Sequence, residues 1–329
     1  MKHSLRPLAI LTLAALAAAG PIPAGAYSAK GSFERTLKVS GPVELEVTTG
    51  AGSITVRPGE ADSLRVIGTI QARSGWLGSV KNAEEKVRSL EANPPIEQTD
   101  NVIRIGHIED WWLRRNVSIS YDLVVPADTR LNSDTGSGDQ SIEGLRGPVK
   151  ADAGSGSIKI SNIGGEVRAD TGSGDIELDS ITGSVYADTG SGEIWARGIG
   201  GGFEADTGSG GVKLEQVAPG DVKVNTGSGS VELRGVRGSL DVDTGSGEIS
   251  VAGEPAGHWK LAAGSGSITV RLPAQATFDL YAHTSSGRIS TEHPISVQGS
   301  IGRRELRGKV RGGGFLLDLH TGSGNIYIE

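Results

Sequence analysis

Residues 169–186 read ADTGSGDIELDSITGSVY, and the fold class follows from the pattern within them. Two short segments within it alternate apolar and polar side chains, with Ile176 and Leu178 in the first and Val185 in the second. This period of two is typical of a half-buried β-strand. Glycines separate the segments, and each glycine inside a helix would cost about 1 kcal/mol. The stretch therefore predicts two strands joined by tight corners.

The same pattern recurs along most of the chain. Its marker is the tetrapeptide Thr-Gly-Ser-Gly, and successive markers are almost evenly spaced until the last two intervals, which are longer. The markers and their near copies begin at Thr135, Ala153, Thr171, Thr189, Thr207, Thr226, Thr244, Ala263, Thr284 and Thr321. An even spacing of this kind indicates a solenoid, in which each unit covers its neighbour. The last interval, from Thr284 to Thr321, has room for two units.

Stacked units bring equivalent residues into columns, because each coil pairs its backbone with adjacent coils at about 4.8 Å. Two aliphatic columns form the predicted core. The first contains Ile158, Ile176, Ile194, Val212, Val231, Ile249, Ile268, Ile289 and Ile326, and the second contains Ile160, Leu178, Ala196, Leu214, Leu233, Val251, Val270 and Ile328. The sequence predicts an all-β, single-stranded parallel β-solenoid (β-helix-like) with about 18 residues per coil. This solenoid is expected over residues 131–329.

Glycine fills the corners of every unit. A sharp corner favours a positive φ angle, which glycine adopts without the steric cost of a side chain. We therefore expect positive φ angles at Gly172, Gly174, Gly190 and Gly192.

Residues 27–130 lack the repeat and read as a β-rich cap that is continuous with the solenoid. A cap is expected, because the first coil would otherwise expose a sheet edge. Apolar residues recur at helical spacing near residues 80–92, so one helix is expected there. Trp111 and Trp112 also fall in this region. The favoured interpretation is that both rings pack over the cap, and an exposed adhesive pair is the alternative.

Residues 1–26 have the composition of a secretory signal peptide. Lys2 and Arg6 precede an apolar run from Leu8 to Ala19, and small residues precede Tyr27, the expected start of the mature chain. The run is too short to span a membrane, which takes about 20 apolar residues. We therefore expect export to the periplasm, the cell surface or the medium, with no membrane span after cleavage.

Composition excludes several classes of function. The chain has no cysteine, which rules out disulfides, thiolate metal sites and a cysteine nucleophile. Its 32 basic and 39 acidic residues give a net charge of −7, so it lacks the basic character that nucleic-acid binding needs. The sequence contains no phosphate-binding loop and no Gly-x-Ser-x-Gly nucleophile elbow. No catalytic residue is assigned, and no cofactor is expected apart from calcium.

An aspartate precedes most markers and forms a further column. Its members are Asp134, Asp152, Asp170, Asp188, Asp206 and Asp243, with Asn225 in the remaining place. Two unit charges about 5 Å apart repel by about 3 kcal/mol in a surface-like dielectric. Three arrangements would each relieve this repulsion: hydrogen bonds from corner N–H groups, side chains that spread apart into the solvent, or a cation bound between coils. We single out this aspartate column as a candidate binding stripe.

One acidic group within the repeat is the best candidate for calcium: Asp241, Asp243 and Glu248. Calcium takes six to eight oxygen ligands, which these carboxylates, serine hydroxyls and corner carbonyls would supply together. The favoured interpretation of the aspartates is structural turn formation. A weak cation site and a ligand-binding stripe are the alternatives.

The exported start, the repeated markers and the strand YDLVVP at residues 121–126 resemble the bacterial putative-adhesin family of β-solenoid domains. That family is a domain of unknown function, and the resemblance covers roughly residues 40–329. It implies a secreted or surface-located rod with an adhesive role, and it implies no catalytic residues.

The leading hypothesis is an exported, non-enzymatic β-solenoid that acts as an adhesin-like binding or structural module of the cell envelope. Repeated chemistry on its faces suits polysaccharide or another envelope component, through many weak contacts. One alternative is a polysaccharide-acting enzyme of the parallel β-helix type that uses aspartates. The other is a rod that self-associates end to end through residues 325–329, which would form a free edge at the last coil.

Overall fold

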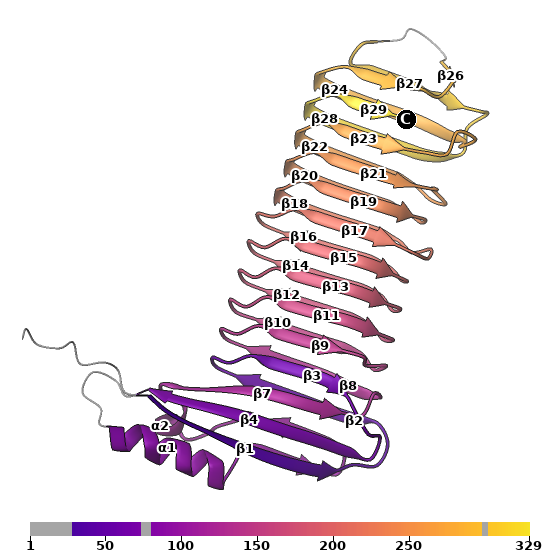
Figure 1. Cartoon of the computed structure of the whole chain (residues 1–329). Coiled ribbons are helices and arrows are strands. Elements are labelled where there is room, and N and C mark those ends of the chain that lie inside the picture. Colours follow the sequence, from indigo (N-terminus) through magenta and orange to yellow (C-terminus); the bar gives the residue numbers. More distant parts are fainter. Residues whose placement is uncertain (1–27, 74–79, 298–301) are drawn as a thin grey trace, which may run out of the picture.

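The computed structural model describes residues 28–73, 80–297 and 302–329. The expected signal peptide, residues 1–26, lies outside the described residues. Figure 1 shows a long stack of strands that runs from an indigo N-terminal end, where the helices lie, to a yellow C-terminal end. Within the described ranges, no helix is long and apolar enough to cross a membrane.

Two long sheets form the stack, and almost every coil contributes one strand to each. Sheet 1 contains 14 strands in the order β1 (Ser28–Lys38), β4 (Ser63–Arg73), β7 (Val117–Val125), β3 (Ile54–Pro58), β9 (Gln140–Glu143), β11 (Ile158–Ile163), β13 (Ile176–Ile181), β15 (Ile194–Ile199), β17 (Val212–Gln216), β19 (Val231–Val236), β21 (Ile249–Gly253), β23 (Ile268–Arg271), β29 (Ile326–Ile328) and β25 (Ile289–Thr291). Sheet 2 contains 15 strands in the order β26 (Ile295–Ser296), β27 (Glu305–Val310), β24 (Phe278–Ser286), β28 (Phe315–Ser323), β22 (Trp259–Ser265), β20 (Leu240–Ser246), β18 (Val222–Ser228), β16 (Phe203–Thr207), β14 (Val185–Thr189), β12 (Val167–Thr171), β10 (Val149–Ala153), β8 (Thr129–Thr135), β2 (Val43–Thr49), β6 (Val102–Ile105) and β5 (Ile96–Thr99).

Strands of the repeat pair in parallel and in the predicted register. In sheet 1, Ile176 is the partner of Ile158 on one side and of Ile194 on the other. In sheet 2, Val167 is the partner of Val185. The predicted parallel β-solenoid, with its predicted coil length, is therefore confirmed.

Aliphatic ladders fill the space between the two sheets. Ile176 and Leu178 point inward from sheet 1, and Val185 and Ala187 point inward from sheet 2, and all four are buried. The two predicted core columns are buried throughout, except that Ile289 in the short strand β25 is half-buried. Each strand contributes only two or three inward side chains, so stacking between coils supplies most of the contacts of each residue.

The threonine of each marker is buried and joins adjacent coils. The Thr189 hydroxyl donates to the carbonyl oxygen of Gly174, one coil earlier, over 2.9 Å, and it accepts from the N–H of Gly192 in its own corner over 3.1 Å. Equivalent bonds to an adjacent coil come from Thr135, Thr171, Thr207, Thr226, Thr244, Thr284 and Thr321. These bonds give a physical reason for threonine in the marker.

The expected positive φ angles at Gly172, Gly174, Gly190 and Gly192 are wrong. These glycines are required because successive corners approach too closely to admit a side chain. A Cβ atom on Gly174 would lie 2.0 Å from the carbonyl oxygen of Gly156 in the adjacent coil. On Gly192 it would lie 1.9 Å from the carbonyl oxygen of Gly174. Close packing of backbones, and not corner geometry, explains the repeated glycine.

Antiparallel strands close the N-terminal end of the stack. β4 pairs with β1 and β7 in sheet 1, and β5 pairs with β6 in sheet 2. Helix α1 (Val80–Ala92) lies where the sequence predicts a helix and buries Val87 and Leu90 against β1 and β4. The division between cap and solenoid near residue 130 stays a prediction, because β2 and β8 pair in parallel across it.

A second helix corrects the expectation of a single one. Helix α2 (Trp111–Arg114) is one turn long, and the Asp110 carboxylate caps it by accepting from the N–H of Trp112 over 2.8 Å. The Lys86 ammonium lies 5.0 Å from the centre of the Trp112 ring, whereas Trp111 is 63% exposed. The expectation that both rings pack over the cap therefore holds for Trp112 alone.

The C-terminal end is closed by a chain crossing that the sequence does not predict. After β23, the chain skips one coil position and forms β24 and β25 in the position beyond it, and then the antiparallel pair β26 and β27. It returns to insert β28 and β29 between the two preceding coils. The expected free edge at residues 325–329 is therefore wrong, because β29 lies between β23 and β25. The interval from Thr284 to Thr321 holds this closing structure and not two repeat units.

Candidate functional site

The aspartate column lies on the outward face of sheet 2. Its members are register partners on adjacent parallel strands, about 4.8 Å apart. In order they are Asp134, Asp152, Asp170, Asp188, Asp206, Asn225 and Asp243. Asp134 and Asp243 at the two ends are exposed, and the members between them are half-buried. The structure therefore brings together all the aspartates that the sequence places in one column.

Neighbouring side chains offset part of the repulsion within the column. The Lys150 ammonium lies 2.5 Å from the Asp152 carboxylate, and the Asn225 amide donates to the Asp206 carboxylate over 2.7 Å. In the described part of the chain, no backbone N–H donates to an aspartate of the column. The sequence analysis named three ways to relieve the repulsion between these carboxylates. Exposure to water is observed for Asp134 and Asp243 at the two ends, whereas capping by corner N–H groups is not observed. Ion pairing with Lys150 adds a mode that the sequence analysis did not consider.

Asp170, with an aspartate on each side of it, has the most perturbed environment of the column. Burial raises the pKa of its carboxyl group, and the negative charges of Asp188 and Asp152 raise it further. The positive charges of Arg168 and Lys150 oppose these effects without cancelling them. Asp170 consequently holds a proton more readily than an ordinary surface aspartate.

A different set of carboxylates caps the corners. Asp139 accepts from the N–H of Ser157 over 3.0 Å, and Asp175 accepts from the N–H of Glu193 over 2.9 Å. Donor and acceptor lie 18 residues apart in both cases, so each bond joins adjacent coils. The sequence analysis missed these residues, although the signal was present: each aspartate directly follows the Gly-Ser-Gly of a marker.

The three proposed calcium ligands belong to one coil and are all exposed. Asp241 and Asp243 lie on β20, and Glu248 follows them in the next corner. The Lys260 ammonium lies 3.9 Å from the Asp241 carboxylate, where it competes with a cation for that group. Within the described ranges, no group of three or more histidine or acidic side chains is placed to hold a metal ion. Calcium binding stays a prediction.

Two open hollows accompany the aspartate column on sheet 2. One, of about 470 Å³, runs along the corners between Asp188 and Asp243. The other, of about 670 Å³, is lined in part by Tyr186 and Arg168 on the same sheet. The Arg168 guanidinium lies 4.0 Å from the centre of the Tyr186 ring, so a cation–π contact already occupies one face of that ring.

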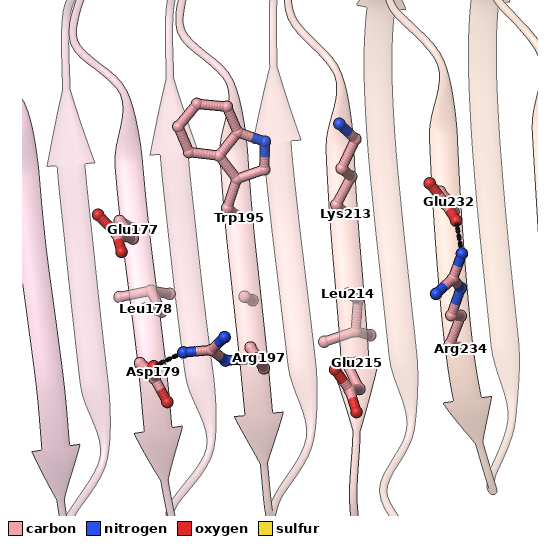
Figure 2. Close-up of a pocket in the computed structure, with 11 residues that line it drawn as sticks. Glu177, Leu178, Asp179, Trp195, Arg197, Lys213, Leu214, Glu215, Glu232 and Arg234 are labelled. Carbon is pink, nitrogen blue, oxygen red and sulfur yellow. Dashed lines mark hydrogen bonds and ion pairs between the residues drawn. The ribbon is translucent and has the colours of Figure 1, made fainter.

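Sheet 1 carries a hollow that the sequence analysis did not single out. It has a volume of about 500 Å³, crosses β13, β15, β17 and β19, and contains Trp195, which is 38% exposed (Figure 2). Arg197 forms an ion pair with Asp179 beside it, and Arg234 pairs with Glu232 at 2.5 Å. The alternation of residues 194–199 is a local signal that directs Trp195 outward, but a hollow depends on side chains of four different coils.

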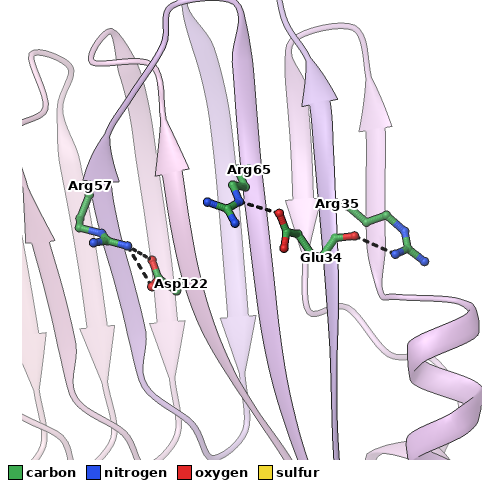
Figure 3. Close-up of polar contacts among 5 residues, drawn as sticks. All are labelled: Glu34, Arg35, Arg57, Arg65 and Asp122. Atoms are coloured by element: carbon green, nitrogen blue, oxygen red, sulfur yellow. Dashed lines mark hydrogen bonds and ion pairs between the residues drawn. The ribbon is translucent and has the colours of Figure 1, made fainter.

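Ion pairs continue along the outward face of sheet 1 into the N-terminal region (Figure 3). The Arg57 guanidinium donates to both carboxylate oxygens of Asp122, at 2.8 and 3.0 Å, and Arg65 pairs with Glu34 at 2.7 Å. The hydrogen bond from Arg65 and its positive charge lower the pKa of Glu34. These pairs are exposed to solvent and contribute little to stability. They leave this part of the face with charges of both signs in balance.

These observations define a closed-ended, two-sheet parallel β-solenoid with a polar, repeating exterior. Residues 185–329 match the model of a protein family described as Toastrack DUF4097. This match confirms the resemblance to a β-solenoid domain of unknown function over the second part of the chain.

Two solved structures are similar to the chain over most of its length. One is a putative cell adhesion protein from Clostridium sporogenes, with 12% identity, a TM-score of 0.23, and coverage of 91% of this chain and 99% of that chain. The other is a putative adhesin from Bacteroides fragilis, with 15% identity, a TM-score of 0.30, and coverage of 91% and 97%. Likeness at these identities and TM-scores does not bear on function. No curated protein matches the chain.

Proposed function

We propose that the protein is an exported, non-enzymatic rod that serves as an adhesin-like binding or structural module of the cell envelope. The observation that carries this proposal is the repetition of one outward chemistry from coil to coil. Asp152, Asp170 and Asp188 occupy equivalent places on adjacent strands of sheet 2. Such a surface suits a repeating partner such as polysaccharide, because many weak contacts act together.

The arrangement of the acidic groups supports a role without catalysis. A glycosidase uses two carboxyl groups that flank the scissile bond and differ in pKa. The aspartates of the column stand side by side on one face of a sheet, so they do not flank a bound sugar. Replacing any one of them with asparagine is therefore expected to leave a measured function intact.

The two ends of the stack support a rod of limited length. At the C-terminal end, the edge strands β25 and β26 have three and two residues. At the N-terminal end, the Glu91 carboxylate of α1 accepts from the N–H of Ser32 on the edge strand β1 over 2.9 Å. Short or covered edges oppose pairing with another chain. End-to-end self-association stays a prediction that no contact in the described part favours.

Export rests on residues 1–26, with Lys2 and Arg6 ahead of the apolar run. Fractionation of cells that express the full chain tests it. We expect a shortened chain in the periplasm, on the surface or in the medium. A full-length chain in the cytosol would contradict export.

Binding is tested by retention of the exported protein on cell-envelope fragments and on a panel of polysaccharides, with calcium and with a chelator. Saturable retention on one class of polymer supports the proposal. Loss of retention with the chelator would assign a cation to the binding face. Absence of retention on every surface would contradict a binding role.

A further inference from the structure

The hollow on sheet 1 contains a large aromatic side chain, Trp195, that is not buried in the core. Trp195 lies on β15, in an outward column between Glu177 of β13 and Lys213 of β17. Burial of an indole ring is favourable, so a partly exposed ring leaves apolar surface for a partner to cover. We propose that this hollow, here called the Trp195 hollow, binds a segment of an uncharged polysaccharide, with one sugar ring stacked on the indole. This inference rests on the proposed function; it names a class of polysaccharide and a site on sheet 1, the sheet that does not carry the aspartate column.

The Trp195 ring is presented as a platform. Figure 2 shows the indole with its broad face toward the viewer, clear of the ion pairs beside it. The floor of the hollow is formed by the same strands at three inward, buried residues: Leu178, Ala196 and Leu214. A π-face attracts the partly positive edges and C–H groups of a flat partner. One face of a sugar ring offers such C–H groups, while its hydroxyls point outward from the ring edge.

The polar rim matches the hydroxyl groups of a sugar. Asp179 accepts a hydrogen bond from Arg197 and another from Ser180, and both bonds lower the pKa of Asp179, so it stays a charged acceptor. Arg197 and Arg234 supply guanidinium donors, and carboxylates supply acceptors. A hydroxyl group is both donor and acceptor, so it can bond to either kind of neighbour.

Charge balance selects an uncharged polymer. Each of three acidic groups near the ring is already paired: Glu177 with Lys159 at 2.8 Å, and Asp179 and Glu232 with the two arginines. Lys213 and Glu215, which face outward from the same strand, add one charge of each sign. The hollow therefore offers no net field that would attract a polyanion or a polycation.

The shape of the hollow suits a polymer. Its volume of about 500 Å³ is spread over four adjacent strands, so it extends roughly 14 Å along the rod at about 4.8 Å per strand step. An open, shallow surface of this length accommodates several sugar units in a row. A small molecule, by contrast, is usually enclosed by its site on most sides.

The test compares four proteins by affinity electrophoresis and titration calorimetry: wild type, Trp195→Ala, Trp195→Phe and Trp111→Ala. The last is a matched control, because Trp111 is an exposed indole outside the hollow. The probes are the neutral polymers laminarin, hydroxyethylcellulose, dextran and mannan, with anionic alginate as the charged comparison. Thermal melting checks that each variant is folded.

We expect at least one neutral polymer to bind. Trp195→Ala weakens that binding about tenfold or more, Trp195→Phe retains most of it, and Trp111→Ala leaves it unchanged. Added polymer changes the indole fluorescence of the wild type, and this change is absent in Trp195→Phe. Binding depends little on salt, because no net charge is neutralised.

The failures of the two proposals are distinguishable. Neutral-polymer binding that Trp195→Ala leaves intact overturns the Trp195 hollow as the site, while the proposed binding function stands. Binding to alginate or envelope fragments alone overturns the uncharged ligand and again leaves the proposed function. Absence of binding to every polymer and to envelope fragments overturns both.

Discussion

The hydroxyl group of Thr189 lies 2.9 Å from the carbonyl oxygen of Gly174 and 3.1 Å from the backbone nitrogen of Gly192. One side chain thus closes its own corner and fastens that corner to the adjacent coil. The hydroxyl must act as donor and acceptor at once, and only serine and threonine offer this in a small side chain. Since the site is buried, water cannot take over either bond without entering the core.

Replacing Thr189 with valine is expected to lower the free energy of unfolding by about 1–3 kcal/mol, because the substitution keeps the shape but leaves the Gly174 carbonyl and the Gly192 N–H without their partner. Chemical denaturation measures the change. Thr189→Ser, which keeps the hydroxyl, should lose less, and Thr182→Val, at an exposed position of the preceding coil, should change little. Equal stability of Thr189→Val and wild type would mean that the hydroxyl bonds have no net effect.

A methyl group at Gly172 is expected to lower the melting temperature clearly. Its Cβ atom would lie 2.5 Å from the carbonyl oxygen of Gly154, so the two coils must separate locally. Overpacking of this kind typically costs about 1–3 kcal/mol. Gly50→Ala is the matched control, because Gly50 holds the same corner position and a Cβ there has no atom within 4 Å. If both variants melt at the same temperature, close approach of the coils is not what requires glycine.

The repeat was predictable because its signals are local. Alternation within residues 169–186 predicts the strands, and the even spacing of the markers aligns Ile176 with Ile158 and Ile194. The reason for glycine was not predictable in the same way. Positive φ is a property of one residue, whereas the contact of Gly174 with Gly156 exists only after the coils stack.

Two further features could not be predicted from the sequence, because they too depend on how separate coils are arranged. The insertion of β28 and β29 between earlier coils leaves each strand with normal repeat chemistry, so no local pattern marks it. The Trp195 hollow depends on side chains from four coils. The aspartate column was predictable, because it needs only the register, but its ion pair with Lys150 needed side-chain positions.

Replacing Asp170 with asparagine is expected to raise the melting temperature at neutral pH. Its pKa is raised in the folded protein, so the folded state binds the proton more readily than the unfolded chain does. Protonation therefore favours folding, and the contribution of Asp170 to stability falls as the pH rises through the raised pKa. The advantage of Asp170→Asn should shrink as the pH falls toward the ordinary carboxyl pKa of 3.8.

Asp134→Asn serves as the control for this prediction, because Asp134 is exposed and has an aspartate neighbour on one side only. It should change the melting temperature less than Asp170→Asn does. Thermal melts at closely spaced values between about pH 4 and about pH 7 make the comparison, since an ordinary aspartate titrates near the lower limit. A melting temperature that Asp170→Asn lowers at neutral pH would show that repulsion within the column is already fully offset.

A chain that ends at Gly314 is expected to melt at a lower temperature and to associate. The truncation removes Leu317, Leu319, Ile326 and Ile328, all buried, each of which stabilises the fold by about 1.5–3 kcal/mol. It also leaves the strands on both sides of the vacated coil with unpaired edges, which invite pairing with other chains. A synthetic peptide of residues 315–329, added in trans, should bind the truncated chain and raise its melting temperature.

The outcome of that truncation decides how strongly the inserted coil is specified. Thr284 of β24 and Ala263 of β22 both hold the marker position opposite Thr321 of β28, so β24 has the register to dock directly on β22 once β28 is gone. Direct pairing of β24 with β22 would restore a continuous stack, and the peptide would then have no site to bind. A truncated chain that melts at the wild-type temperature and ignores the peptide would therefore contradict the prediction. Recovery of the melting temperature on addition of the peptide would show that β24 and β25 do not pair directly with β22 and β23, so that the vacated position remains specific for residues 315–329.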